Sequence, residues 1–212
     1  MMRTIYGRAT SSNVQLVMWA MAELDLDHER LDYGHAHGGL DTPAFLAMSP
    51  HGKIPVLKDG DLVIWESCAI LRYLAATHGS EAFWPKDPRA RAQIDMWAEW
   101  GKNELCNSFT VPIFWSRVRT AAKDRDEAAL ARAVAVFNGY MARLNQQLGD
   151  QPFVCGSTLT AADNVLGHLL YRWFTIDVFR DPQPLVKAYY ARLTERPAYR
   201  DHVMVPFDVL QV

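Results

Sequence analysis

Cysteine is scarce in this sequence: its 212 residues include three, Cys68, Cys106 and Cys155. They are far apart, odd in number and form no Cys-x-x-Cys pair. A disulfide framework and a zinc site both need grouped cysteines, so this spacing excludes both and fits a reducing compartment.

The sequence also lacks an excess of charge and a long apolar run. Lys and Arg number 22 against 24 Asp and Glu, for a formal net charge of -2, so neither nucleic acid nor an anionic membrane is an expected partner. No apolar run approaches the roughly 20 residues needed to cross a bilayer, and residues 1–7 lack the core of a signal peptide. We therefore expect a cytoplasmic protein.

Residues 1–82 alternate between strand and helix signals. Strand-like runs lie at 4–6, 29–33, 54–57 and 62–65, and helical patterns lie at 13–24 and from Ser67 onward. Asp59-Gly60 between two of the apolar runs indicates a hairpin. A β-α-β unit followed by β-β-α predicts an α/β domain, in which helices pack on a mixed four-stranded sheet.

Strand signals nearly vanish after Pro88. Helical patterns cover 89–118, 126–148, 161–175 and 184–195, and Arg196-Pro197 is expected to close the last of them. The segment 83–88 contains two prolines and has the character of a linker. We therefore predict an N-terminal domain over 1–82, a linker over 83–88 and an all-helical bundle over 89–212.

Two serines precede the first predicted helix. Ser12 and Gln15 have the spacing of a capping box, so Ser12 is expected to cap the helix. Ser11 would then lie just outside the helix N-terminus, where backbone N–H groups and the helix dipole favour negative charge. Simple capping is the alternative role for both serines.

Two further stretches have the character of a ligand site. In Lys53-Ile54-Pro55-Val56, a cis Ile54–Pro55 bond would leave the Ile54 backbone able to pair with an extended, peptide-like ligand. Glu66-Ser67 stands at the start of the next helix, where Ser67 is a plausible N-cap. A carboxylate and a hydroxyl beside free N–H groups suit a molecule with both an amine and a carboxylate. Taken alone, a surface lysine and an ordinary helix start explain these residues too.

These three stretches, in this order and spacing, resemble the glutathione transferase superfamily. The likeness is most specific over 49–57 and 65–70, and Thr160-Ala161-Ala162-Asp163 is similar to the family's buried capping motif. Residues 6–14 look like a bacterial serine-type branch, theta- or beta-like. The resemblance implies a cytosolic detoxification enzyme with a thioredoxin-like N-terminal domain, glutathione as co-substrate and no metal.

The resemblance also implies a role for each motif residue. Ser11 would hydrogen-bond the glutathione sulfur, with Ser12 and Asn13 as alternatives. The remaining contacts with glutathione would come from the Ile54 backbone beside a cis Pro55, from Glu66 and Ser67 at the γ-glutamyl end, and from Lys53 at the glycyl carboxylate. Many relatives have histidine or glutamine before the Ile-Pro pair, where this chain has Gly52-Lys53, and this departure bears on the glycyl contact.

The electrophile is expected in the cleft between the domains, along the first helix of the bundle. Val111, Phe114, Trp115 and Val118 form an apolar stripe there at helical spacing, which core packing also explains. Arg119 and Arg117 could attract an acidic substrate, or they could simply be solvated at a helix end.

The expected reaction is transfer of the glutathionyl group to a small alkyl or aryl electrophile. The alternatives are peroxide reduction, dehalogenation or isomerisation on the same fold, or a binding protein without catalysis. Relatives are dimers, and a homodimer is expected here because apolar side chains exceed the needs of one small domain. Those side chains are Trp65, Leu71, Tyr73, Trp97 and Trp100.

Overall fold

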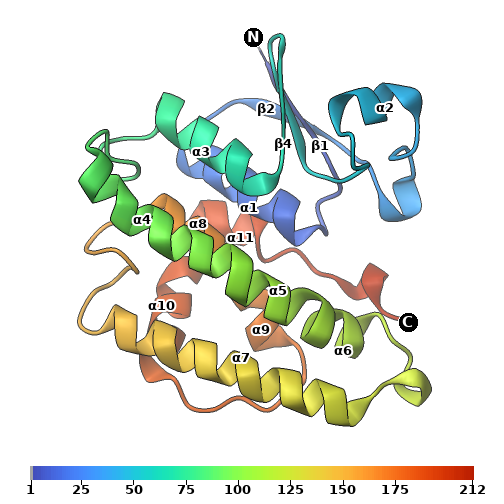
Figure 1. The fold of residues 1–212 in the computed structure, drawn as a ribbon, viewed down its shortest axis with the longest axis vertical. Helices are drawn as coiled ribbons and strands as arrows, with labels where there is room; N and C mark the ends of the chain where they lie inside the picture. The colour runs from blue at the N-terminus through green and yellow to red at the C-terminus, as the bar shows by residue number, and fades with distance from the viewer. Residues whose placement is uncertain (1) are drawn as a thin grey trace.

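The computed structural model describes residues 2–212 and has two parts, a small sheet with its helices and a larger helical bundle (Figure 1). The sheet has four strands in the order β2-β1-β3-β4. Strand β1 pairs in parallel with β2 and antiparallel with β3, and β3 pairs antiparallel with β4. The predicted mixed sheet is thus confirmed. Its strands are β1 (Arg3–Tyr6), β2 (His28–Leu31), β3 (Val56–Asp59) and β4 (Leu62–Trp65).

The turn between β3 and β4 is the hairpin predicted from Asp59-Gly60. Asp59 faces Leu62 in the register, and Gly60 has φ +64°, a conformation that glycine adopts without steric cost. Two helices pack on the sheet, α1 (Ser12–Glu23) and α3 (Ser67–His78). A short helix, α2 (Pro43–Met48), and a 3-10 turn, η1 (His35–His37), fill the connection between β2 and β3, where no element was predicted.

Helix α1 joins the two parts of the molecule. It contacts α3 on one side and the bundle helices α8 and α11 on the other. Nine of its residues are buried, among them Val14, Leu16, Val17 and Trp19. A helix that is apolar on all sides is buried on all sides. The start of α1 is therefore held firmly between the domains.

The first helix of the bundle runs without a break from Pro88 to Val118, as predicted. It consists of α4 (Pro88–Trp100), the π-helical segment η2 (Gly101–Cys106), α5 (Asn107–Phe109), a second π-helical segment η3 (Thr110–Trp115) and α6 (Ser116–Val118). Gly101 allows α8 to approach closely, because a Cβ there would lie 2.8 Å from Leu166 Cδ2. Pro112, within η3, has no N–H for the regular α-helical ladder.

The remaining elements complete the bundle. They are η4 (Ala122–Asp124), α7 (Glu127–Leu148), α8 (Ala161–Gly167), α9 (Leu170–Thr175), α10 (Pro184–Thr194), α11 (Pro197–His202) and η5 (Asp208–Leu210). The helix predicted over 161–175 is instead interrupted after Gly167. The helix predicted over 184–195 ends at Thr194, before Arg196-Pro197 as expected, and Pro197 then begins a further helix that was not predicted, because proline suits the first turn of a helix. None of the helices within residues 2–212 is long and apolar enough to cross a membrane.

A buried carboxylate organises the start of α8. Asp163 accepts hydrogen bonds from the backbone N–H groups of Val154 (3.0 Å) and Thr160 (2.7 Å), and from the hydroxyls of Thr160 (2.9 Å) and Tyr189 (2.9 Å). Burial raises the pKa of the Asp163 carboxyl, and these hydrogen bonds oppose that shift. The structural role predicted for Thr160-Ala161-Ala162-Asp163 agrees with this arrangement.

Candidate functional site

Ser11 lies at the N-terminus of α1, between the sheet and the bundle. It is the N-cap residue, with an extended backbone (φ -88°, ψ 122°), and its side chain makes no capping hydrogen bond. Its carbonyl accepts the N–H of Gln15 (2.9 Å). The prediction that Ser12 caps the helix was wrong, because Ser12 is the first residue of the helix itself and is buried. The partly exposed Ser11 hydroxyl is therefore not used for capping.

Gln15 does not form the predicted capping box either. Its side-chain amide donates to the Ala9 carbonyl (3.0 Å) and thereby braces the loop before the helix. Arg172 of α9 donates to the Thr10 carbonyl (2.7 Å) and lies beside the Gln15 side-chain oxygen (3.4 Å). Ser11 is thus positioned by a loop that is tied to both domains.

The two helix N-termini of the first domain meet at Asn13 and Ser67. The Ser67 hydroxyl donates to Asn13 Oδ1 (3.3 Å), and Lys102 Nζ from η2 reaches both Asn13 Oδ1 (2.9 Å) and Ser67 Oγ (3.3 Å). Sequence reasoning missed Lys102. The sequence gives one indication of its role, which is that a lysine stands within the long first helix of the bundle, on the face next to the N-terminal domain.

Glu66 precedes α3 in a conformation that few residues other than glycine adopt. Its φ is +73° and its exposed side chain makes no capping hydrogen bond. Such a backbone costs on the order of 1–3 kcal/mol and clusters at functional sites. Ser67 was expected to cap α3, but Glu66 is the N-cap and the buried Ser67 is the first helical residue. Glu66 therefore places an exposed carboxylate at the N-terminus of α3 that is not used for capping.

The stretch before β3 has the backbone form that the resemblance implies. The Ile54–Pro55 peptide bond is cis, and Ile54 stands outside the β1–β3 pairing, which begins at Val56. A Cβ on Gly7 would lie 3.3 Å from Ile54 Cβ, so Ile54 packs against the loop that leads to Ser11. The Lys53 side chain is exposed, and its backbone exchanges hydrogen bonds with the Ser49 hydroxyl (3.0 and 3.3 Å).

The predicted apolar stripe divides into two faces. Phe114 and Val118 are buried in the bundle, whereas Val111 and Trp115 are 55% and 42% exposed. Arg119 lies over the Trp115 ring, with its guanidinium carbon 4.7 Å from the ring centroid. The outward face is thus formed by Val111, Trp115 and Arg119.

The three cysteines do not have the character of nucleophiles. Burial raises the pKa of Cys68, and it raises the pKa of Cys106 and of Cys155 to about 12 in each case. A thiol that stays protonated at neutral pH is a weak nucleophile. Within residues 2–212, no group of three or more acidic, histidine or cysteine side chains is arranged to hold a metal ion.

Comparison with known proteins agrees with this geometry. Residues 5–82 match the family described as glutathione S-transferase, N-terminal domain, and residues 127–192 match its C-terminal domain family. Glutathione S-transferase GstB of Escherichia coli K12 is 35% identical over 207 residues, which cover 97% of this chain and 99% of that protein. Glutathione S-transferase 3 of Zea mays is 30% identical over 216 residues, with 94% of this chain and 92% of that protein covered.

A solved structure shares the whole architecture. The theta class glutathione S-transferase of Xanthomonas axonopodis pv. citri, crystallised with glutathione bound, superposes with a TM-score of 0.91 at 40% identity. The alignment covers 96% of this chain and 98% of that one. A thioredoxin-like domain followed by a helical domain defines the class, and the chain belongs to the glutathione S-transferase family. Its bacterial relatives place it in the bacterial branch of the cytosolic superfamily.

Proposed function

We propose that this glutathione S-transferase joins glutathione to small electrophiles and that Ser11 stabilises the attacking thiolate. The observation that carries the proposal is the Ser11 hydroxyl, which is not used for capping and lies at the N-terminus of a buried helix. A hydroxyl can donate to a thiolate, and the helix N-terminus adds favourable potential. When the glutathione thiol releases its proton, the sulfur forms a bond to carbon, and the bond from that carbon to the leaving group breaks.

The neighbouring motifs support a cradle for the rest of glutathione. Ile54 would pair through its backbone with the cysteinyl unit beside cis Pro55, and Lys53 would meet the glycyl carboxylate. The γ-glutamyl end would lie between Glu66 and Ser67. Lys102, with its ammonium 3.3 Å from Ser67 Oγ, adds a cation for the carboxylate of that unit.

The proposed reaction is tested by retention on immobilised glutathione, followed by conjugation assays with halogenated aromatics and epoxides. Retention together with steady conjugation supports the proposal. If the protein is retained but turns over only peroxides or isomerisable substrates, its activity is peroxide reduction or isomerisation. If it is retained and turns over no substrate, it is a binding protein without catalysis. The free cysteines agree with the cytoplasmic location that we propose for the protein. We propose detoxification of electrophiles as its physiological role.

Replacing Glu66 with alanine should weaken glutathione binding by about 2 kcal/mol, because a charged hydrogen bond is lost and the glutathione amine is left unpaired. That loss is roughly a thirtyfold rise in Kd, measurable by titration calorimetry. Glu66→Gln, which keeps the size of the side chain, should lose nearly as much. Asp61→Ala, an exposed acid at the hairpin tip, is the matched control. Equal affinities for the wild type and Glu66→Ala would remove Glu66 from the site.

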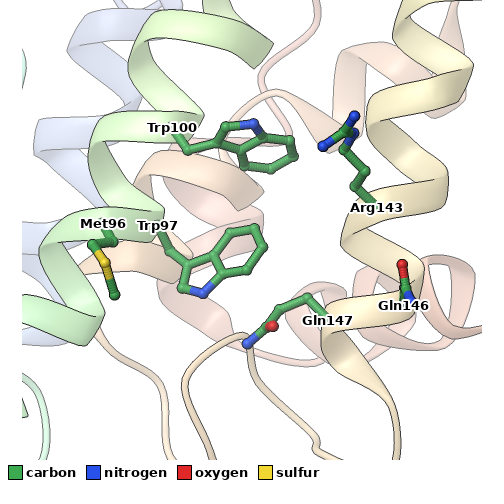
Figure 2. Close-up of a pocket in the computed structure, with 6 residues that line it drawn as sticks. All are labelled: Met96, Trp97, Trp100, Arg143, Gln146 and Gln147. Carbon is green, nitrogen blue, oxygen red and sulfur yellow. The ribbon is translucent and has the colours of Figure 1, made fainter.

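We also propose that the protein is a homodimer. Trp65 of β4 is 38% exposed and Met96 of α4 is 56% exposed. A groove of about 560 Å³ runs between α4 and α7, with Met96, Trp97 and Trp100 on one wall and Arg143, Gln146 and Gln147 on the other (Figure 2). Leu71, expected on this surface, is instead buried in its own domain. An apolar area of this kind favours association.

Sedimentation velocity at micromolar concentration should give a single species with the mass of two chains. Met96→Glu, which places a charge on the exposed α4 face, should shift the distribution toward the monomer, because charge is disfavoured at the core of an interface. Glu127→Lys on the distant end of α7 serves as a control for the change in charge. A wild-type protein that sediments as a monomer would contradict the proposal.

A further inference from the structure

In the described part of the chain, residues 2–212, Arg8, Arg119 and Arg172 have no carboxylate partner. Arg8 lies in the loop after β1, Arg119 follows α6, and Arg172 lies on α9. Among residues 2–212, the arginines with ion pairs are Arg3, Arg30, Arg72, Arg117, Arg125 and Arg196, and these three are not among them. Guanidinium groups without a counter-charge are unfavourable in a partly buried setting, and they therefore favour the arrival of an anion.

Arg8 is the central member of this arginine cluster. Its backbone carbonyl accepts the N–H of Ser11 (3.1 Å), so it is tied directly to the thiol site. Its Nε is buried and has no hydrogen-bond partner. Its Nη1 lies close over Gly34, 3.7 Å from where a Cβ would stand. The side chain therefore carries a buried N–H donor that no acceptor satisfies.

The charges of the cluster act on one another across the domain boundary. Burial lowers the pKa of Arg8, and the charge of Arg119 lowers it further. Burial also lowers the pKa of Arg172, to about 9, with Arg8 as the next contribution. Desolvation and the charges of Arg8 and Arg119 lower the pKa of His35, on the β2–β3 connection. Arg8 and Arg119 are thus close enough for their charges to act on each other, although they come from different domains.

We propose that Arg8 and Arg119 bind a carboxylate on the electrophile, so that this enzyme prefers acidic electrophiles over neutral ones. The inference rests on the proposed transferase function and names the substrate class of that site. Arg172 has another task, because it is buried and holds the Thr10 carbonyl. It adds positive potential from beneath the loop, and the Phe114 ring lies 4.4 Å from its guanidinium carbon.

The surroundings of Arg119 favour the electrophile as the source of the anion. The guanidinium of Arg119 lies over the exposed ring of Trp115, and Trp115 stands one helical turn beyond the exposed Val111. The apolar surface formed by Val111 and Trp115 is therefore next to a positive charge. An aryl group with an acidic substituent matches both features. Arg117, two residues earlier, is paired with Asp177 (2.6 Å) and contributes no free charge.

The inference is tested with two aryl chlorides that differ only in charge, 4-chloro-3-nitrobenzoate and 4-chloro-3-nitrobenzamide. With either one, the thiolate sulfur forms a bond to the ring carbon, the carbon–chlorine bond breaks with chloride as the leaving group, and the thiol proton goes to solvent. Each kcat/KM is divided by the rate constant of the uncatalysed reaction with glutathione, which removes the difference in intrinsic reactivity. The corrected ratio of benzoate to benzamide reports the preference for the acid.

The wild type should favour the benzoate by about tenfold or more, the range of a charged hydrogen bond. Arg119→Gln and Arg8→Gln should each bring the corrected ratio close to one, and Arg119→Lys should restore part of it. Arg117→Gln is the matched control and should leave the ratio unchanged. Adding salt should lower the ratio, since part of the attraction acts over a distance through solvent.

Other outcomes separate this inference from the function on which it rests. A wild type that binds glutathione but shows no preference for the benzoate, or turns over neither chloride, contradicts the acidic-substrate inference alone. If Arg8→Gln and Arg119→Gln weaken glutathione binding and leave the ratio unchanged, the arginines serve the carboxylates of glutathione and the inference is overturned. If the two variants raise the pKa of the bound thiol without moving the ratio, the arginines stabilise the thiolate. The acidic-substrate inference is overturned in that case too. A wild type that does not bind glutathione overturns the proposed function itself.

Discussion

Replacing Asp163 with alanine should lower the free energy of unfolding by about 3–5 kcal/mol, because each buried donor left without an acceptor costs about 1–3 kcal/mol. Four donors would lose their acceptor, two of them backbone N–H groups with no freedom to turn elsewhere. The side chain is fully buried, so water does not replace it. For a chain of this size the midpoint should fall by roughly 10 °C, measurable by thermal denaturation and by urea titration.

Asp126→Ala is the matched control for this effect. Asp126 caps α7 by accepting the Ala129 N–H (2.8 Å), but it does so at an exposed helix start. Its loss should cost about 1 kcal/mol, as for an ordinary N-cap. Tyr189→Phe should show an intermediate loss, because one donor leaves and the carboxylate keeps the others. Equal losses for Asp163→Ala and Asp126→Ala would mean that burial adds nothing to the Asp163 network.

Replacing Ser11 with alanine should reduce the conjugation rate at neutral pH on the order of tenfold. A hydrogen bond to a charged acceptor contributes about 1.5–3 kcal/mol, and losing it should raise the pKa of the bound thiol by about one to two units. The thermal midpoint should hardly change, because the Ser11 side chain makes no capping hydrogen bond. Steady-state kinetics as a function of pH and thermal denaturation check the two halves of this prediction.

The size of the expected rate loss follows from two opposing effects. A two-unit rise in pKa, from about 6.5 to 8.5, lowers the thiolate fraction at pH 7 roughly 25-fold. The more basic thiolate is a better nucleophile, which returns about eightfold at a Brønsted slope near 0.45. Ionisation alone therefore accounts for about threefold, and the remainder reflects the sulfur's lost position against the electrophile. The deficit should shrink as the pH is raised, and a deficit that is independent of pH would assign Ser11 to positioning alone.

Local signals in the sequence predicted most of the fold. The Asp59-Gly60 turn, the strand runs around it and the long helix from Pro88 depend on short-range preferences, and all of them are present. The residues at which the helices begin were predicted less accurately. Ser12 and Ser67 both satisfy the composition of an N-cap, but each helix begins one residue earlier than assumed. Serine, like glutamate, is acceptable on either side of a helix start, so composition does not determine the register.

The site was predictable only where a motif is contiguous. Ser11, Pro55 and Glu66 stand in local motifs that a reader of the sequence can find. Lys102 and Arg172 stand in none, because Lys102 meets Asn13 in the first turn of α1 and Arg172 meets Thr10 in the loop before it, across 89 and 162 residues of chain. The predicted domain boundaries, at residues 82 and 89, stay predictions. The predicted roles of the site residues stay predictions as well.

The central claim is that Ser11 stabilises the glutathione thiolate, and the direct measurement is the ultraviolet absorbance of the bound thiolate as a function of pH. It is made on glutathione complexes of the wild type, Ser11→Ala and Ser12→Ala. The account predicts that Ser11→Ala moves the titration up by about one to two units, while Ser12→Ala leaves it in place. A titration that moves with Ser12→Ala and not with Ser11→Ala would contradict the assignment. If neither moves it, the helix N-terminus or Asn13 holds the thiolate, and the serine mechanism is wrong for this protein.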